Sequence, residues 1–87
     1  MQYSDFTVPQ VSAENGQIVD NTLTLALKSD KALIKLDVCL DGKFAGSVEK
    51  SGRSIDVSYS DDGLGTASQI FVRVYDQYLN SADITIK

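Results

Sequence analysis

The side chains that most often carry catalysis are scarce in this chain of 87 residues. It contains no histidine and one cysteine, Cys39. Without histidine no His-based catalytic triad can form, and the thiol of Cys39 has no imidazole to activate it. The four nitrogen and sulfur ligands of a typical zinc site cannot be assembled within one chain either. We therefore expect no enzymatic activity, no catalytic residue, no cofactor and a passive thiol at Cys39.

Carboxylates are the second group that could do chemistry. Asp41, Asp61 and Asp62 fall in predicted turns, and carboxylate and carbonyl oxygens are the ligands that calcium takes. Their spacing matches no calcium loop, however, and Asp-Gly and Asp-Asp-Gly are ordinary turn formers. Adjacent acids on a turn also rarely present both carboxylates to one substrate at the separation that hydrolysis needs. We expect these residues to form turns and to hold no metal, with calcium binding as the open alternative.

Aromatic and charged side chains late in the chain are the main candidates for binding. Phe71, Arg73 and Tyr75 alternate with aliphatic residues, so they share the outward face of an extended strand. A Phe, an Arg and a Tyr on an open sheet face are typical of protein-binding hot spots, and Tyr78 on the next turn can extend the patch. Two other interpretations stay open. Aromatic pairs between strands can simply stiffen a sheet, and a glycan can stack on Tyr75 or Tyr78.

Alternation of apolar and polar residues runs through the whole chain and indicates strands rather than helices. Seven segments show it: residues 3–8, 18–28, 34–40, 44–49, 55–59, 70–75 and 82–86. Asp41-Gly42 is a strong signal for a tight hairpin between the third and fourth segments. Seven short strands in a chain of this length predict an all-β fold, an antiparallel two-sheet sandwich of the immunoglobulin-like (Ig-like) type. We expect a single domain over residues 1–87.

From residue 34 onward the chain resembles the Ig-like domains that are repeated in bacterial surface proteins and appended to phage structural proteins. The resemblance lies in LDVCLDGKFAG at residues 36–46, Leu-Gly-Thr at 64–66 and VRVYDQYLN at 72–80. Those domains usually end their penultimate strand in Asp-x-x-Gly-Asn. Asp76 and Asn80 fit this pattern, whereas Leu79 stands where glycine is usual. The resemblance implies a non-catalytic module that binds, spaces or decorates.

Composition narrows the expected partners. The chain has 8 basic and 12 acidic residues and no basic run, which disfavours binding to nucleic acid or to an anionic membrane. No apolar stretch approaches the roughly 18 residues of a membrane span, and the first residues lack the features of a signal peptide. We expect a phage virion component, a capsid decoration or tail protein, that binds a protein partner or a host surface. A repeat of a bacterial surface adhesin and a small carbohydrate-binding module are the alternatives, so the expected location is the virion or the bacterial cell surface.

Strands that alternate in direction would sort the loops onto two ends of the molecule. One end would receive residues 10–17, 41–43 and 60–68 and be acidic, while the other would receive 28–33, 50–53 and 76–80 and be basic. Met1 would lie at the basic end and Lys87 at the acidic end. Copies stacked head to tail would then meet with opposite charge. The alternative is that the loops are polar only because they are solvated.

Overall fold

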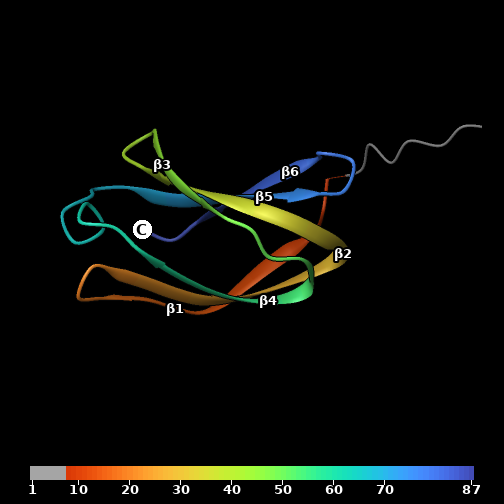
Figure 1. Ribbon diagram of the computed structural model, residues 1–87, viewed down its shortest axis with the longest axis horizontal. Coiled ribbons are helices and arrows are strands. Elements are labelled where there is room, and N and C mark those ends of the chain that lie inside the picture. The colour runs from red at the N-terminus through yellow and green to blue at the C-terminus, as the bar shows by residue number, and fades with distance from the viewer. Residues whose placement is uncertain (1–7) are drawn as a thin grey trace, which may run out of the picture.

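The computed structural model describes residues 8–87, which form six antiparallel strands and no helix (Figure 1). The strands are β1 (Val11–Val19), β2 (Thr22–Leu40), β3 (Lys43–Val48), β4 (Gly52–Ser60), β5 (Ile70–Asp76) and β6 (Ser81–Thr85). They hydrogen-bond into one sheet that curls into a half-barrel. The predicted all-β class is confirmed. The strand predicted at residues 3–8 lies, apart from Val8, outside the described residues.

β2 organises this sheet because four other strands pair with it. Its first part, as far as Ser29, pairs with β1 and β4, and its second part, from Leu33, pairs mainly with β3 and β5. β6 extends the sheet from the far side of β5. Figure 1 shows β2 turning round at one end of the molecule, from the lower to the upper part of the curled sheet.

The long β2 differs from the two separate strands expected at residues 18–28 and 34–40. Residues 29–32, Ser-Asp-Lys-Ala, contain neither glycine nor proline, so the local sequence permits the extended backbone that strand pairing on either side imposes. The pairing register with β4 shifts across this stretch, between Lys28 and Leu33, and the register with β5 shifts just after it, between Leu33 and Lys35. The chain therefore bends and changes partners without leaving the sheet.

The bend also explains a change of parity in the hydrophobic pattern of β2. Leu23, Leu25 and Leu27 are buried at odd positions in the first part, whereas Leu36 and Val38 are buried at even positions in the second. Successive side chains of a strand point to opposite faces. Leu33 is also buried at an odd position, so the shift of one position falls between Leu33 and Lys35, and this shift lets both parts of β2 face one core.

That core fills the concave side of the sheet. Its members are Leu23, Leu25, Leu27, Leu33, Leu36, Val38, Ile55, Val57, Leu64, Ala67, Ile70, Val72 and Val74. Fully burying one such aliphatic side chain stabilises the fold by roughly 1.5–3 kcal/mol. Leu64 and Ala67 come from the loop between β4 and β5 and are almost wholly buried, so this loop is part of the core as well as a turn.

The first hairpin was missed by the sequence patterns. Residues 10–17 were expected to be a loop, yet most of them belong to β1, and the turn to β2 falls at Asp20-Asn21. Both turn residues are left-handed, with φ of 51° and 60°, as in a type I′ hairpin. β1 is exposed along nearly its whole length, so it lacks the alternation that marks a half-buried strand. The predicted Asp41-Gly42 hairpin is confirmed, with φ of 52° and 82°.

Loops gather at both ends of the molecule (Figure 1). At one end, Asp41 Oδ1 accepts hydrogen bonds from the amides of Ser68 and Gln69, both at 2.9 Å. The last residue, Lys87, also lies there, since its carbonyl accepts from the Ile70 amide. Placing residues 10–17 at this acidic end was wrong, because Gln10 donates its amide to Asp30 at the opposite end. Met1 lies outside the described residues.

Candidate functional site

The face predicted for binding exists on β5. Phe71, Arg73 and Tyr75 are partly exposed, while Val72 and Val74 between them are fully buried. Strong alternation of this kind follows from a strand whose inner side packs on the core. The structure therefore places the three predicted residues on one side of the strand, away from the core.

The sheet register extends this side of β5 across three neighbouring strands. Arg73 lies between Asp37 of β2 and Asp83 of β6, and Asp37 in turn lies opposite Ser47 of β3. We call this surface the outer face. Its members are Lys35, Asp37 and Cys39 of β2, Phe44 and Ser47 of β3, Phe71, Arg73 and Tyr75 of β5, and Ser81, Asp83 and Thr85 of β6.

The Arg73 guanidinium is held in place at the centre of the outer face. Its Nε donates to Asp83 Oδ1 at 2.7 Å and its Nη2 donates to Asp83 Oδ2 at 3.1 Å. This hydrogen bonding and the opposite charge lower the pKa of Asp83 and raise that of Arg73. The guanidinium carbon also lies 5.5 Å from the centre of the Phe71 ring, within cation–π range. A bidentate pair of this kind fixes the orientation of the guanidinium as well as the position of its charge.

Tyr75 is likewise tied to its neighbours. Its hydroxyl donates to Asp37 Oδ2 at 3.1 Å, and the Ser47 hydroxyl donates to Asp37 Oδ1 at 3.0 Å. Partial burial is the main cause that raises the pKa of Tyr75. The hydrogen bond to Asp37 and the negative charge of that carboxylate raise it further. The Lys35 ammonium lies 5.0 Å from the ring centre. Lys35 therefore lies over one face of the Tyr75 ring.

Phe44 is the residue of the outer face that the sequence patterns did not single out. Its side chain is 64% exposed, and both Phe44 and Phe71 lie opposite Cys39 on the two flanking strands. The signal was present: a two-residue turn at Asp41-Gly42 pairs Leu40 with Lys43 and hence Cys39 with Phe44. Cys39 itself is almost buried, and this burial raises the pKa of its thiol, in line with a passive role.

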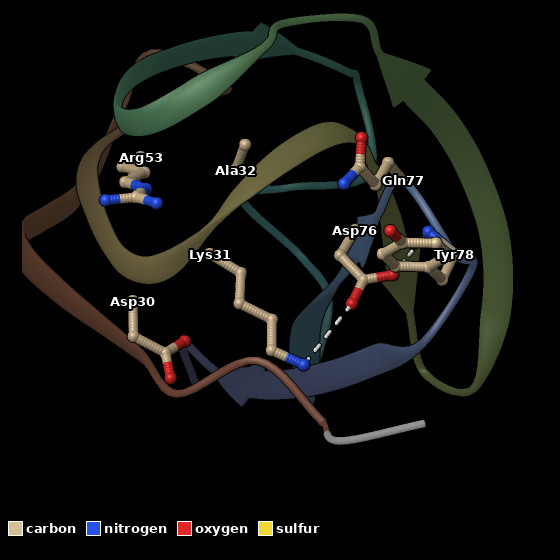
Figure 2. A pocket seen from close by; sticks show the side chains of 7 residues that line it. All are labelled: Asp30, Lys31, Ala32, Arg53, Asp76, Gln77 and Tyr78. Carbon is tan, nitrogen blue, oxygen red and sulfur yellow. Dashed lines mark hydrogen bonds and ion pairs between the residues drawn. The ribbon is translucent and has the colours of Figure 1, made fainter. Parts of the chain in front are cut away.

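Tyr78, the fourth predicted residue, lines a pocket at the end where β2 bends (Figure 2). The pocket has a volume of about 290 Å³ and is formed by three separate segments. They are Asp30, Lys31 and Ala32 from the bend of β2, Arg53 from the start of β4, and Asp76, Gln77 and Tyr78 from the turn after β5. Strands that alternate in direction predict that these three segments lie at the same end of the molecule, and the structure brings them together there.

Asp76 anchors one side of this pocket. Its side chain is 1% exposed, and it accepts hydrogen bonds from the amides of Tyr78 and Asn80 at 2.8 and 3.0 Å and from Asn80 Nδ2 at 3.1 Å. Lys31 Nζ lies 3.9 Å from Asp76 Oδ2 (Figure 2). A buried carboxylate supplied with this many donors holds the turn rigidly.

Backbone amides engage the carboxylates of two acidic turns. Asp41 uses one carboxylate oxygen on two backbone amides, and Asp61 Oδ2 accepts the Gly63 amide at 2.9 Å. In that range no three His, Cys, Asp or Glu side chains lie together as metal ligands. These contacts are the ones expected of aspartates that form turns.

Comparison with known proteins finds no matching family model, curated protein or solved structure. The described part of the chain contains no helix long and apolar enough to cross a membrane. The chemistry of the outer face and of the pocket is therefore what any functional argument has to rest on.

Proposed function

We propose that this chain is a non-catalytic Ig-like interaction module that binds a protein partner through the outer face. The observation that carries the proposal is the exposed ring of Phe44 and the partly exposed ring of Phe71, which flank Cys39 beside a guanidinium already fixed by Asp83. Aromatic and arginine side chains dominate the binding energy of protein interfaces. A phage capsid or tail component, or a host surface, is the partner that the sequence resemblance suggests, with an adhesin repeat as the alternative.

Strand pairing supports the Ig-like, two-sheet part of this proposal. β1, the first part of β2 and β4 form one group of strands, and β3, the second part of β2, β5 and β6 form another. Ig-like sandwiches group their strands in the same way, with A, B and E in one sheet and C, F and G in the other. In this assignment the continuous β2 takes the place of strands B and C. The outer face would then lie on the sheet that contains C, F and G.

Preorganisation makes the outer face suited to binding. Interfaces lose affinity when flexible side chains must be ordered on association. Arg73 and Tyr75 are already held by Asp83 and Asp37, so little of that cost remains for a partner to overcome. The same contacts support a non-catalytic role, because the charged groups of the face are engaged with one another and the pKa of Cys39 is raised.

Site-specific cross-linking tests this proposal. A photo-reactive phenylalanine analogue replaces Phe71 in one variant and Ser58 of β4 in a matched control, since Ser58 is exposed on a strand outside the outer face. We expect one partner to cross-link in high yield from position 71 and not from position 58. The affinity for that partner should then fall at least about tenfold in Phe44→Ser. Equal cross-linking from both positions, or unchanged affinity of Phe44→Ser, would contradict the proposal.

A further inference from the structure

The pocket at the bend of β2 is a separate site with chemistry of its own. It shares no lining residue with the outer face, and it is built from the bend of β2, the start of β4, and the end of β5 with the turn that follows it. Its walls are held by main-chain hydrogen bonds to the buried Asp76 and by the pairing of Leu33 with both Gly52 and Asp76. The pocket is therefore formed before any ligand arrives.

Polar side chains of the lining offer both donors and acceptors of hydrogen bonds. Arg53 and Lys31 donate, Asp30 accepts, and the Gln77 amide does both. Figure 2 shows these side chains spread around the opening, with the Tyr78 ring on the side opposite Arg53. Planar guanidinium and amide groups match pairs of neighbouring hydroxyls, because each can make two hydrogen bonds at once. Asp30 can accept from a hydroxyl through Oδ2, since its Oδ1 already accepts the Gln10 amide at 2.8 Å.

An apolar surface completes the lining. The Tyr78 side chain is 49% exposed, and the methyl group of Ala32 lies on the same pocket. A half-exposed aromatic ring can stack on a flat, weakly polarised C–H surface. A pyranose ring presents such a surface on one side and hydroxyls around its edge.

Charge and volume narrow the ligand further. The lining contains two cations and two carboxylates, namely Lys31, Arg53, Asp30 and Asp76. Its net formal charge is therefore zero, and an anionic ligand gains little electrostatic attraction. The volume of about 290 Å³ lies at the low end of ligand pockets, which span roughly 300–1,000 Å³. That is room for one sugar ring and not for a folded segment of protein.

The geometry points to a saccharide-binding site in which one neutral monosaccharide unit stacks on Tyr78 and hydrogen-bonds to Arg53, Asp30 and Gln77. This site is independent of the outer face. The module can thus hold a glycan at its loop end while a protein occupies the sheet surface.

The test is an NMR titration of the full chain with D-glucose, D-galactose, D-mannose and N-acetyl-D-glucosamine, with D-glucuronate as the charged comparison. We expect at least one neutral sugar to shift the amide signals of residues 30–32, 53 and 76–78 with a dissociation constant on the order of 1–10 mM. Tyr78→Ala and Arg53→Met should each weaken this binding about tenfold. Both side chains are exposed, so we expect both variants to fold.

Matched controls keep the result specific. Phe44→Ala removes an exposed aromatic ring from the outer face, and Lys43→Met removes a cation at the opposite end of the molecule. Neither should change the affinity for the sugar. The proposal fails if no neutral sugar shifts the pocket amides at about 50 mM, if only glucuronate does so, or if Tyr78→Ala and Arg53→Met bind as the unaltered chain does. Each of these outcomes leaves the outer-face proposal standing, because none of them involves Phe71.

Discussion

Arg73 and Asp83 form a bidentate charged pair, and the pH dependence of its contribution to stability can be predicted. The hydrogen bond and charge of Arg73 hold the pKa of Asp83 below its ordinary value of 3.8. A carboxyl whose pKa is lowered by folding stabilises the fold above its ordinary pKa, and the gain is lost as the pH falls through the lowered value. Both side chains are roughly half exposed, so solvent screens much of the attraction.

Replacement of Asp83 by Asn should therefore flatten the acid limb of the stability profile. We expect the melting temperature of Asp83→Asn to fall less than that of the unaltered chain between about pH 5 and pH 2. Thermal melts followed by circular dichroism measure this. Asp62→Asn, at an exposed acid in the loop between β4 and β5, is the control. A profile of Asp83→Asn parallel to that of the unaltered chain would show that the pair does not stabilise the fold.

Leu79 is a residue in a backbone conformation that suits another residue better. Its φ is 64°, in the left-handed region, and its side chain is 65% exposed. A side chain in this region costs roughly 1 kcal/mol that glycine avoids. This is the position at which the resembling domains carry glycine, so the structure supplies a physical reason for that preference.

Leu79→Gly should therefore raise the free energy of unfolding by about 0.5–1 kcal/mol. Chemical denaturation with urea measures the change. Leu79→Ala is the matched control, because alanine loses the exposed side chain but keeps the Cβ atom that causes the strain. Equal stabilisation by both variants would mean that exposure of the leucine, and not its backbone, was unfavourable.

At the scale of elements, β3 and β4 are not hydrogen-bonded to each other, and a side chain closes the space between them. Tyr59 of β4 reaches across to Gly46 of β3, where a Cβ atom would come within 2.9 Å of the ring carbon Cε1 and closer still to the hydroxyl. Burial is the main cause that raises the pKa of Tyr59, and the negative charge of Asp61 raises it further. Glycine at position 46 is needed because the ring lies directly on the backbone.

Gly46→Ala should destabilise the fold by about 1–3 kcal/mol, since an added methyl group must displace the Tyr59 ring. The free energy of unfolding measures this, and the cost should be smaller in a Tyr59→Phe background that lacks the hydroxyl. A double-mutant cycle gives the difference. Additive effects of the two substitutions would show that the Tyr59 hydroxyl does not limit position 46.

At the scale of the whole molecule, the difference in charge between the ends is weaker than the loop compositions suggested. Lys28 pairs with Glu14 at 3.8 Å, and Lys31 with Asp76 at 3.9 Å. Since these pairs lie within the chain, little unbalanced positive charge is left at the bend of β2 to attract the acidic turns of another copy.

We therefore expect the chain to be a monomer in solution, rather than to stack head to tail. Size-exclusion chromatography with light scattering, at about 0.05 and 0.5 M salt and over a range of protein concentrations, measures the mass of 9.4 kDa directly. A dimer or larger species that dissociates at high salt would contradict this and restore the stacking hypothesis.

The sequence by itself determined the features that neighbouring residues encode. Alternation predicted the face shared by Phe71, Arg73 and Tyr75, and Asp41-Gly42 predicted a hairpin whose register also places Phe44. Such patterns are readable because side-chain direction along a strand and the φ angles of a tight turn depend on local chemistry.

Only the tertiary structure decided the rest. β1 carries no alternation because it is exposed along nearly its whole length, and β2 continues through residues 29–32 because strands from distant parts of the chain pair on both sides of the bend. The pocket depends on the same long-range pairing, which brings residues 30–32, 53 and 76–78 together. Hydrogen bonds between distant strands, and not local propensity, set where a strand bends and which loops meet there.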